Sequence, residues 1–155
     1  MDKLKRLIES KQNLFINTKK EIWDRIFEIL EWGKILINLE KIKTEREFLK
    51  KLYKELLKQE NIKEIFTEYD INKNNFELFY LLDLEDELDI WWLKIIFNNI
   101  EKTSTEIQQI INYLVSYRER KIIFYMIWNL DEYYYLTWVE DMNIRERDDY
   151  LKIDL

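Results

Sequence analysis

The scarcity of glycine and proline constrains this chain most: it contains one glycine, Gly33, and no proline. Tight β-hairpins favour Asn-Gly, Asp-Gly or another glycine-containing pair, because their central residues adopt positive φ. No such pair joins two apolar segments here. The sequence therefore favours helices joined by polar turns over a sheet built from hairpins.

The same composition excludes several kinds of functional site. P-loops and dinucleotide-binding turns need closely spaced glycines, which this chain does not have. Because the chain has no histidine and no cysteine, it has no His-based catalysis, thiol nucleophile, disulfide or Cys/His zinc site. We therefore predict no cofactor and no metal. Alanine is also missing, which together with few glycines and many lysines and asparagines indicates an AT-rich genome.

Helix starts are the clearest local signal. A capping box pairs a threonine with a glutamate three residues later, and each side chain satisfies a backbone N–H of the first turn. It occurs three times, at Thr18/Glu21, Thr44/Glu47 and Thr103/Glu106. Apolar residues follow each box at the helical period, and further stripes begin at Ile62 and Leu88. We expect a helix at each of these five places.

The C-terminal segment 121–155 is ambiguous. Its longest apolar run, Ile122 to Trp128, suits a buried element, and its Ile, Tyr, Trp and Phe content also fits a pleated surface. We predict a single all-α domain over 1–155, a compact irregular bundle of about seven to nine short helices. The alternative is an α+β fold with a small antiparallel sheet in 121–155.

Two features bear on location. No apolar stretch approaches the length of about 18 residues that a membrane-spanning helix needs. The N-terminal segment also lacks the apolar core of a signal peptide. We therefore expect a cytoplasmic protein with no membrane partner.

One segment, starting at Asp70, resembles a calcium-binding loop. Asp70, Asn72 and Asn74 occupy the first three ligand positions of an EF-hand loop, and Asn75 replaces its glycine. The position of the bidentate glutamate holds Leu81, which has no ligand atom. A polar turn between helices is the better interpretation.

Charge is distributed unevenly along the chain, whose net charge is −6. Residues 1–77 carry 17 Lys and Arg against 15 Asp and Glu, whereas residues 78–155 carry 8 against 16. The second half also holds four of the six Trp and eight of the ten Tyr. Aromatic side chains ringed by carboxylates suit a surface that docks a basic protein. The candidate partner-binding residues are Asp83, Glu85, Asp86, Glu87, Asp89, Asp131, Glu132, Tyr133, Tyr134, Trp138, Glu140 and Asp141.

A basic stripe runs through the segment 46–58. Its members recur every four residues, so that they share one face of the predicted helix: Arg46, Lys50, Lys54 and Lys58. Such a stripe is typical of a solvated outer face, and it is also able to track a phosphate backbone. The net negative charge of the chain weighs against direct contact with nucleic acid.

These observations favour a non-enzymatic, acidic interaction protein. We expect it to bind and inhibit or neutralise a basic, nucleic-acid-handling protein, as immunity proteins and phage anti-defence inhibitors do as classes. Two alternatives remain: a nucleic-acid accessory protein that uses the stripe at 46–58, and an enzyme that depends on carboxylates alone.

Overall fold

The computed structural model describes residues 2–10, 13–18, 22–30, 33–81, 83–84, 93–115, 122–128 and 150–154. They form five α-helices, one short 3-10 helix and five strands. In chain order these are α1 (Asp2–Glu9), β1 (Asn13–Asn17), α2 (Trp23–Ile29), β2 (Lys34–Asn38), α3 (Glu45–Leu56), α4 (Glu60–Glu68), β3 (Lys94–Asn98), η1 (Ile100–Lys102), α6 (Thr105–Val115), β4 (Ile123–Trp128) and β5 (Tyr150–Asp154).

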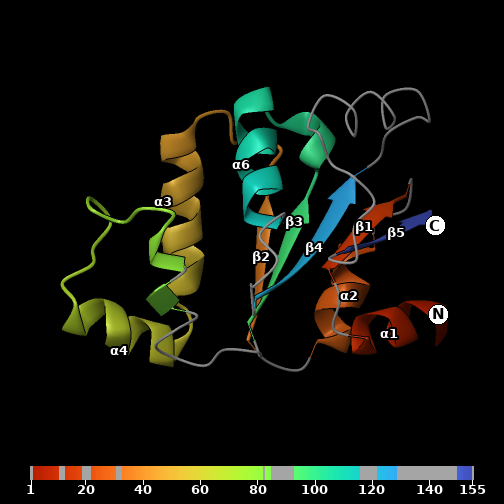
Figure 1. Ribbon diagram of the computed structural model, residues 1–155, viewed down its shortest axis with the longest axis horizontal. Helices are drawn as coiled ribbons and strands as arrows, with labels where there is room; N and C mark the ends of the chain where they lie inside the picture. The colour runs from red at the N-terminus through yellow and green to blue at the C-terminus, as the bar shows by residue number, and fades with distance from the viewer. Residues whose placement is uncertain are drawn as a thin grey trace.

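The strands form one sheet in the order β2-β3-β4-β1-β5, and every pairing is parallel (Figure 1). Across its centre, Leu36 pairs with Ile96, and Ile96 pairs with Tyr125. The protein is therefore α/β. The prediction of an all-α bundle of seven to nine helices is wrong, and so is the alternative of an antiparallel sheet in 121–155, because β4 and β5 both run parallel to β1.

Burial on both faces explains why the inner strands were not predicted from the sequence. All six residues of β4 are buried, and so are the three central residues of β1 and of β3. Strands of a parallel sheet covered on both sides are continuously apolar and lack the alternation that marks a half-exposed strand. The helix expected from the stripe at Leu88 is correspondingly wrong over Lys94–Asn98, which is β3.

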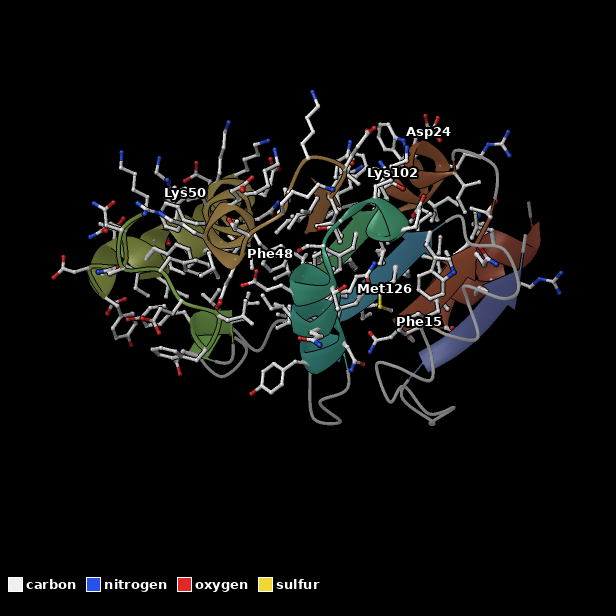
Figure 2. The ribbon with its side chains drawn as sticks, turned by 90° about the horizontal axis from the view of Figure 1, so that it is seen from above. Phe15, Asp24, Phe48, Lys50, Lys102 and Met126 are labelled. Atoms are coloured by element: carbon white, nitrogen blue, oxygen red, sulfur yellow. The ribbon has the colours of Figure 1, made fainter. Side chains whose placement is uncertain are left out.

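Two helical layers cover the sheet. On one face Phe97, Phe124 and Met126 pack in a core with apolar residues of α3, α4 and α6. On the other face Ile96 and Tyr125 pack in a second core with α1 and α2. Seen from above, α2 and α6 lie on opposite sides of the strands, and α3 and α4 lie beyond the β2 edge (Figure 2).

The order of the strands accounts for these layers. From β1 the chain passes α2 and reaches the far edge at β2, and it then returns strand by strand to β3 and β4. Right-handed crossovers in opposite directions place their helices on opposite faces of a sheet. The sheet therefore separates α2 from α3, α4 and α6. The N-termini of α3 and α6 lie at the carboxyl ends of the strands (Figure 1).

The three capping boxes have different outcomes. At α3 the predicted helix start and the threonine half of the box are confirmed, because the Thr44 hydroxyl accepts a hydrogen bond from the Glu47 N–H at 3.2 Å. The Glu47 carboxylate accepts from the Thr44 hydroxyl at 3.1 Å, which differs from the backbone contact that a capping box predicts. At α6 the box is displaced by one residue, because Ser104 accepts from the Ile107 N–H. Thr18 is not the N-cap of α2, since it is a buried residue directly after β1 and the N-cap of α2 is Ile22.

We expect Thr44→Ala to lower the free energy of unfolding by about 1 kcal/mol, because the first turn of α3 loses its side-chain acceptor. Urea unfolding followed by circular dichroism measures the difference. Thr105→Ala is the matched control, an exposed first residue of α6, and it should change stability by no more than about 0.5 kcal/mol. Equal losses for the two variants would contradict a capping role for Thr44.

Candidate functional site: a groove along α3

Of the twelve candidate partner-binding residues, the structure describes one. Asp83 is exposed, and its N–H donates to the carbonyl of Phe79. The other members of that set lie outside the described residues: Glu85, Asp86, Glu87, Asp89, Asp131, Glu132, Tyr133, Tyr134, Trp138, Glu140 and Asp141.

The basic stripe has three members on the solvent side of α3, Arg46, Lys50 and Lys54, and Lys58 follows the end of the helix; all four side chains are exposed. Lys58 forms an ion pair with Glu55 at 3.0 Å. Within the described part of the chain, Arg46, Lys50 and Lys54 take part in no ion pair. Lys50 points away from the body of the protein (Figure 2).

The segment that resembles a calcium loop is a turn closed by its own side chains. The Asn72 carboxamide oxygen accepts from the N–H groups of Asn74 and Asn75, at 2.8 and 3.2 Å. The Asn75 side chain accepts from the Asn72 N–H at 2.7 Å and donates to the carbonyl of Asp70 at 2.9 Å. The oxygens of Asn72 and Asn75 thus serve the backbone of the turn.

The carboxyl ends of the strands are where open parallel sheets usually bind ligands. Here the loops after β2 and β3 are joined to each other. Asn99 donates to the Asn38 side chain at 2.7 Å, Thr103 and Ser104 donate to the carbonyls of Ile42 and Lys43, and the Lys43 ammonium donates to the carbonyl of Lys102. These bonds tie the two loops together at the carboxyl ends of β2 and β3.

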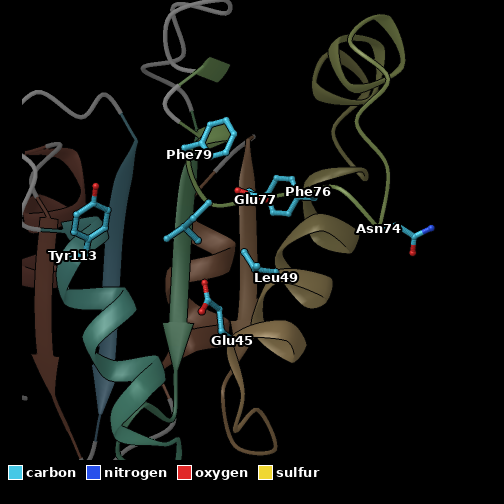
Figure 3. A pocket seen from close by; sticks show the side chains of 8 residues that line it. Glu45, Leu49, Asn74, Phe76, Glu77, Phe79 and Tyr113 are labelled. Carbon is cyan, nitrogen blue, oxygen red and sulfur yellow. The ribbon is translucent and has the colours of Figure 1, made fainter.

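A cavity of about 540 Å³ opens between α3, α6 and the segment 74–79 (Figure 3). Glu45 and Leu49 of α3 line one side, Tyr113 of α6 lines another, and Phe76 and Phe79 come from the connecting segment. Three parts of the chain that are far apart in sequence thus meet at one opening.

Aromatic side chains form the walls and the support of this cavity. Phe79 and Tyr113 are 51% and 56% exposed, which is unusual for large apolar side chains. Phe76 is buried, and its ring centroid lies 5.6 Å from that of Tyr53 and 5.7 Å from that of Phe66. The floor is therefore anchored in the core, whereas Phe79 and Tyr113 remain accessible at the surface.

A second cavity of about 690 Å³ continues from the first along α3. The two share Glu45, Leu49, Asn74 and Phe76, so together they form one depression, which we call the α3 groove. The charged residues lining the first cavity, as far as the structure describes the chain, are Glu45 and Glu77, and we call this cavity the acidic end. We call the second cavity the basic end; its charged lining residues are Arg46, Lys50, Lys73, Glu45 and Glu106.

No protein-family model matches this chain, and no curated protein matches it at a significant level. Within the described residues, no three acidic side chains are grouped so as to hold a metal ion. No helix in that part of the chain is long and apolar enough to cross a membrane.

Sequence reasoning missed the aromatic residues of the groove. The apolar stripe of α6 runs through Ile107, Ile111 and Leu114, all buried, and Tyr113 stands off that stripe on the exposed side. The position of Tyr113 outside this stripe was a signal in the sequence that its ring would be exposed. Phe79 carried no such signal, because the segment before it has no regular period.

Proposed function

We propose that this protein is a non-enzymatic interaction protein that docks a basic protein in the acidic end of the α3 groove. One observation carries the proposal: two carboxylates, Glu45 and Glu77, share a cavity with the exposed rings of Phe79 and Tyr113, and none of the described residues that line it is a lysine or an arginine. This combination is complementary to lysine or arginine side chains.

The physical basis is the dual character of a basic side chain. An arginine or lysine has an apolar stem and a charged head, so it can pack its stem against an aromatic ring while the head reaches a carboxylate. Tyrosine is also enriched at the centres of protein interfaces. The net charge of −6 adds a long-range attraction that speeds encounter with a basic partner.

The proposed consequence is neutralisation of a nucleic-acid-handling protein in the cytoplasm. A protein that binds nucleic acid presents basic side chains to phosphates. An acidic protein that covers these side chains competes directly with the nucleic acid. Immunity proteins and anti-defence inhibitors act in this way as classes, and here the analogy rests on charge, size and the acidic end of the groove.

The test uses a fluorescein-labelled peptide of alternating arginine and leucine, with a glutamate–leucine peptide of equal length as its counterpart. Fluorescence anisotropy should show binding of the basic peptide alone. In Glu45→Gln/Glu77→Gln the affinity should fall by about five- to twentyfold at low salt, since two charge-assisted contacts are lost.

The matched control is Glu64→Gln/Glu68→Gln, which removes the same two charges from exposed positions of α4. It should weaken binding less than the groove variant, because it alters only the long-range field. Phe79→Ala should weaken binding as well while the protein stays folded. If both double variants lose affinity equally, the attraction is a property of net charge and the groove is not the docking site.

A second candidate function has one observation in its favour. Arg46, Lys50 and Lys54 are exposed and take part in no ion pair with the described residues, so the stripe on α3 is available to phosphates. Binding of labelled DNA that weakens steeply with salt, and that Lys50→Gln/Lys54→Gln reduces, would support a nucleic-acid accessory role. The carboxylate-enzyme alternative depends on the densest acidic run of the sequence, Asp83, Glu85, Asp86, Glu87 and Asp89. Only Asp83 of this run lies within the described residues, so no geometry accompanies that alternative.

A further inference from the structure

The α3 groove has opposite charge at its two ends. Among the described residues that line the acidic end there are two carboxylates and no cation. At the basic end three cations, Arg46, Lys50 and Lys73, face two carboxylates, Glu45 and Glu106. The basic end therefore carries an excess of one positive charge, which one carboxylate of a bound segment would balance.

Helix geometry separates the two charges on α3. Consecutive residues of an α-helix project about 100° apart, whereas residues four apart share a face. Glu45 therefore shares a face with Leu49, and Arg46 shares the adjacent face with Lys50. The Leu49 side chain lines both cavities, so apolar surface connects the two charged ends.

The third cation comes from a different element. Lys73 lies in the turn that the side chains of Asn72 and Asn75 close, so its backbone is held in place across from α3. Arg46, Lys50 and Lys73 form no ion pair with the described residues. Two separate parts of the chain thus direct available cations to one cavity.

Building on the proposed function, we infer that the α3 groove selects a protein segment that carries both charges. Its basic residue lies against Glu45, Glu77 and the exposed aromatic rings, and an acidic residue lies against Arg46, Lys50 and Lys73. Apolar contact with Leu49 and Phe76 links the two. The partner is therefore recognised by a pattern of charge, whereas a uniformly basic segment leaves the basic end of the groove unmatched.

The experiment compares two labelled peptide types that share an arginine–leucine anchor. One type carries a glutamate about three to eight residues beyond the anchor, a range that allows for the reach of an extended chain, and the other carries glutamine at the same place. Because the protein is negative overall, long-range repulsion disfavours the glutamate peptides. A preference for any glutamate peptide therefore reports a local contact.

We expect the parent protein to bind the best glutamate peptide about two- to fivefold more tightly than its glutamine counterpart. In Arg46→Gln/Lys50→Gln/Lys73→Gln this preference should disappear or reverse, while the glutamine peptide still binds. The charge-matched control, Lys5→Gln/Lys41→Gln/Lys63→Gln, changes exposed lysines that line neither cavity and should retain the preference.

The outcomes separate the two proposals. If the parent prefers every glutamine peptide, or if the triple groove variant keeps the parent's preference, the charge-pattern inference is wrong and docking of a basic segment stands. If neither peptide type binds, or if binding is indifferent to Glu45→Gln/Glu77→Gln, the proposed function fails and this inference fails with it.

Discussion

Replacing Phe97 by alanine should lower the free energy of unfolding by about 3–5 kcal/mol, which is the usual cost of removing a large aromatic side chain from a core. Phe97 lies in β3 and is fully buried. Its ring centroid lies 5.9 Å from that of Phe48 in α3 and 5.9 Å from that of Phe124 in β4. It thus connects the sheet to the helix that carries the groove.

Urea unfolding of the parent and of Phe97→Ala measures this loss. Phe79→Ala is the matched control: the same chemical change at a side chain that is 51% exposed should shift stability by about 1 kcal/mol at most. Similar losses for the two variants would mean that Phe97 is not at the centre of the core. Because Phe79 lines the groove, the same control also reports on docking.

The helices that cover the sheet on the groove side were predictable from the sequence. In α3 the residues Phe48, Leu52 and Leu56 recur at the helical period and are fully buried, and Thr44 caps the first turn. In α6 the residues Ile107 and Ile111 follow the same period. These signals are local, since they depend only on which face of a helix is apolar, and tertiary contacts did not override them.

The sheet was not predictable by the same means. The lack of glycine turns correctly argues against two-residue hairpins, and all pairings of the described strands are indeed parallel. Parallel strands, however, are joined by crossovers that contain helices and need no glycine turn. A sequence without hairpin turns is therefore still compatible with a parallel sheet, and the all-α prediction was wrong for this reason.

The segment Ile122 to Trp128 illustrates the limit of periodicity. Its interpretation as a buried element is confirmed, since all seven residues are buried. A short apolar run is compatible with either a buried helix or a strand of a covered parallel sheet. Its bonding decides between them: β4 pairs with β3 on one side and β1 on the other, which are contacts between residues far apart in the chain.

The groove shows the same limit for function. Glu45, Glu77 and Tyr113 are separated by more than thirty residues each along the chain, and the crossovers β2–β3 and β3–β4 bring them to one cavity. The excess of acidic residues in the second half of the chain predicted an acidic docking surface, but it favoured the densest acidic runs over Glu45 and Glu77. Local composition could not predict this pairing, because the two glutamates and the exposed rings come together only in the fold.

Alkaline pH should destabilise the protein through Tyr125. This residue lies in β4, paired with Ile96 on one side and Leu14 on the other, and it is 1% exposed. Burial raises the pKa of its hydroxyl from 10.0 to about 12, because the phenolate would lose its hydration. Burial in the fold therefore favours the neutral form of Tyr125 over the charged form.

The sign of the pH dependence follows from that shift in pKa. Below pH 10 the Tyr125 hydroxyl is neutral in both the folded and the unfolded chain, so this group has its full stabilising contribution. Between pH 10 and 12 the unfolded chain releases the proton first, so that stability falls as the pH rises. Two pKa units correspond to a total loss of about 2.7 kcal/mol, at about 1.4 kcal/mol per unit.

Tyr125→Phe isolates this contribution, because every other titrating group is retained. Unfolding free energies measured from pH 8 to about pH 12 should fall more steeply for the parent than for Tyr125→Phe, and the two curves should diverge only above the ordinary tyrosine pKa. Parallel curves for the parent and Tyr125→Phe would show that the Tyr125 hydroxyl ionises as readily in the folded chain as in the unfolded one, and the tight burial of β4 between its two helical layers would then be wrong at this position.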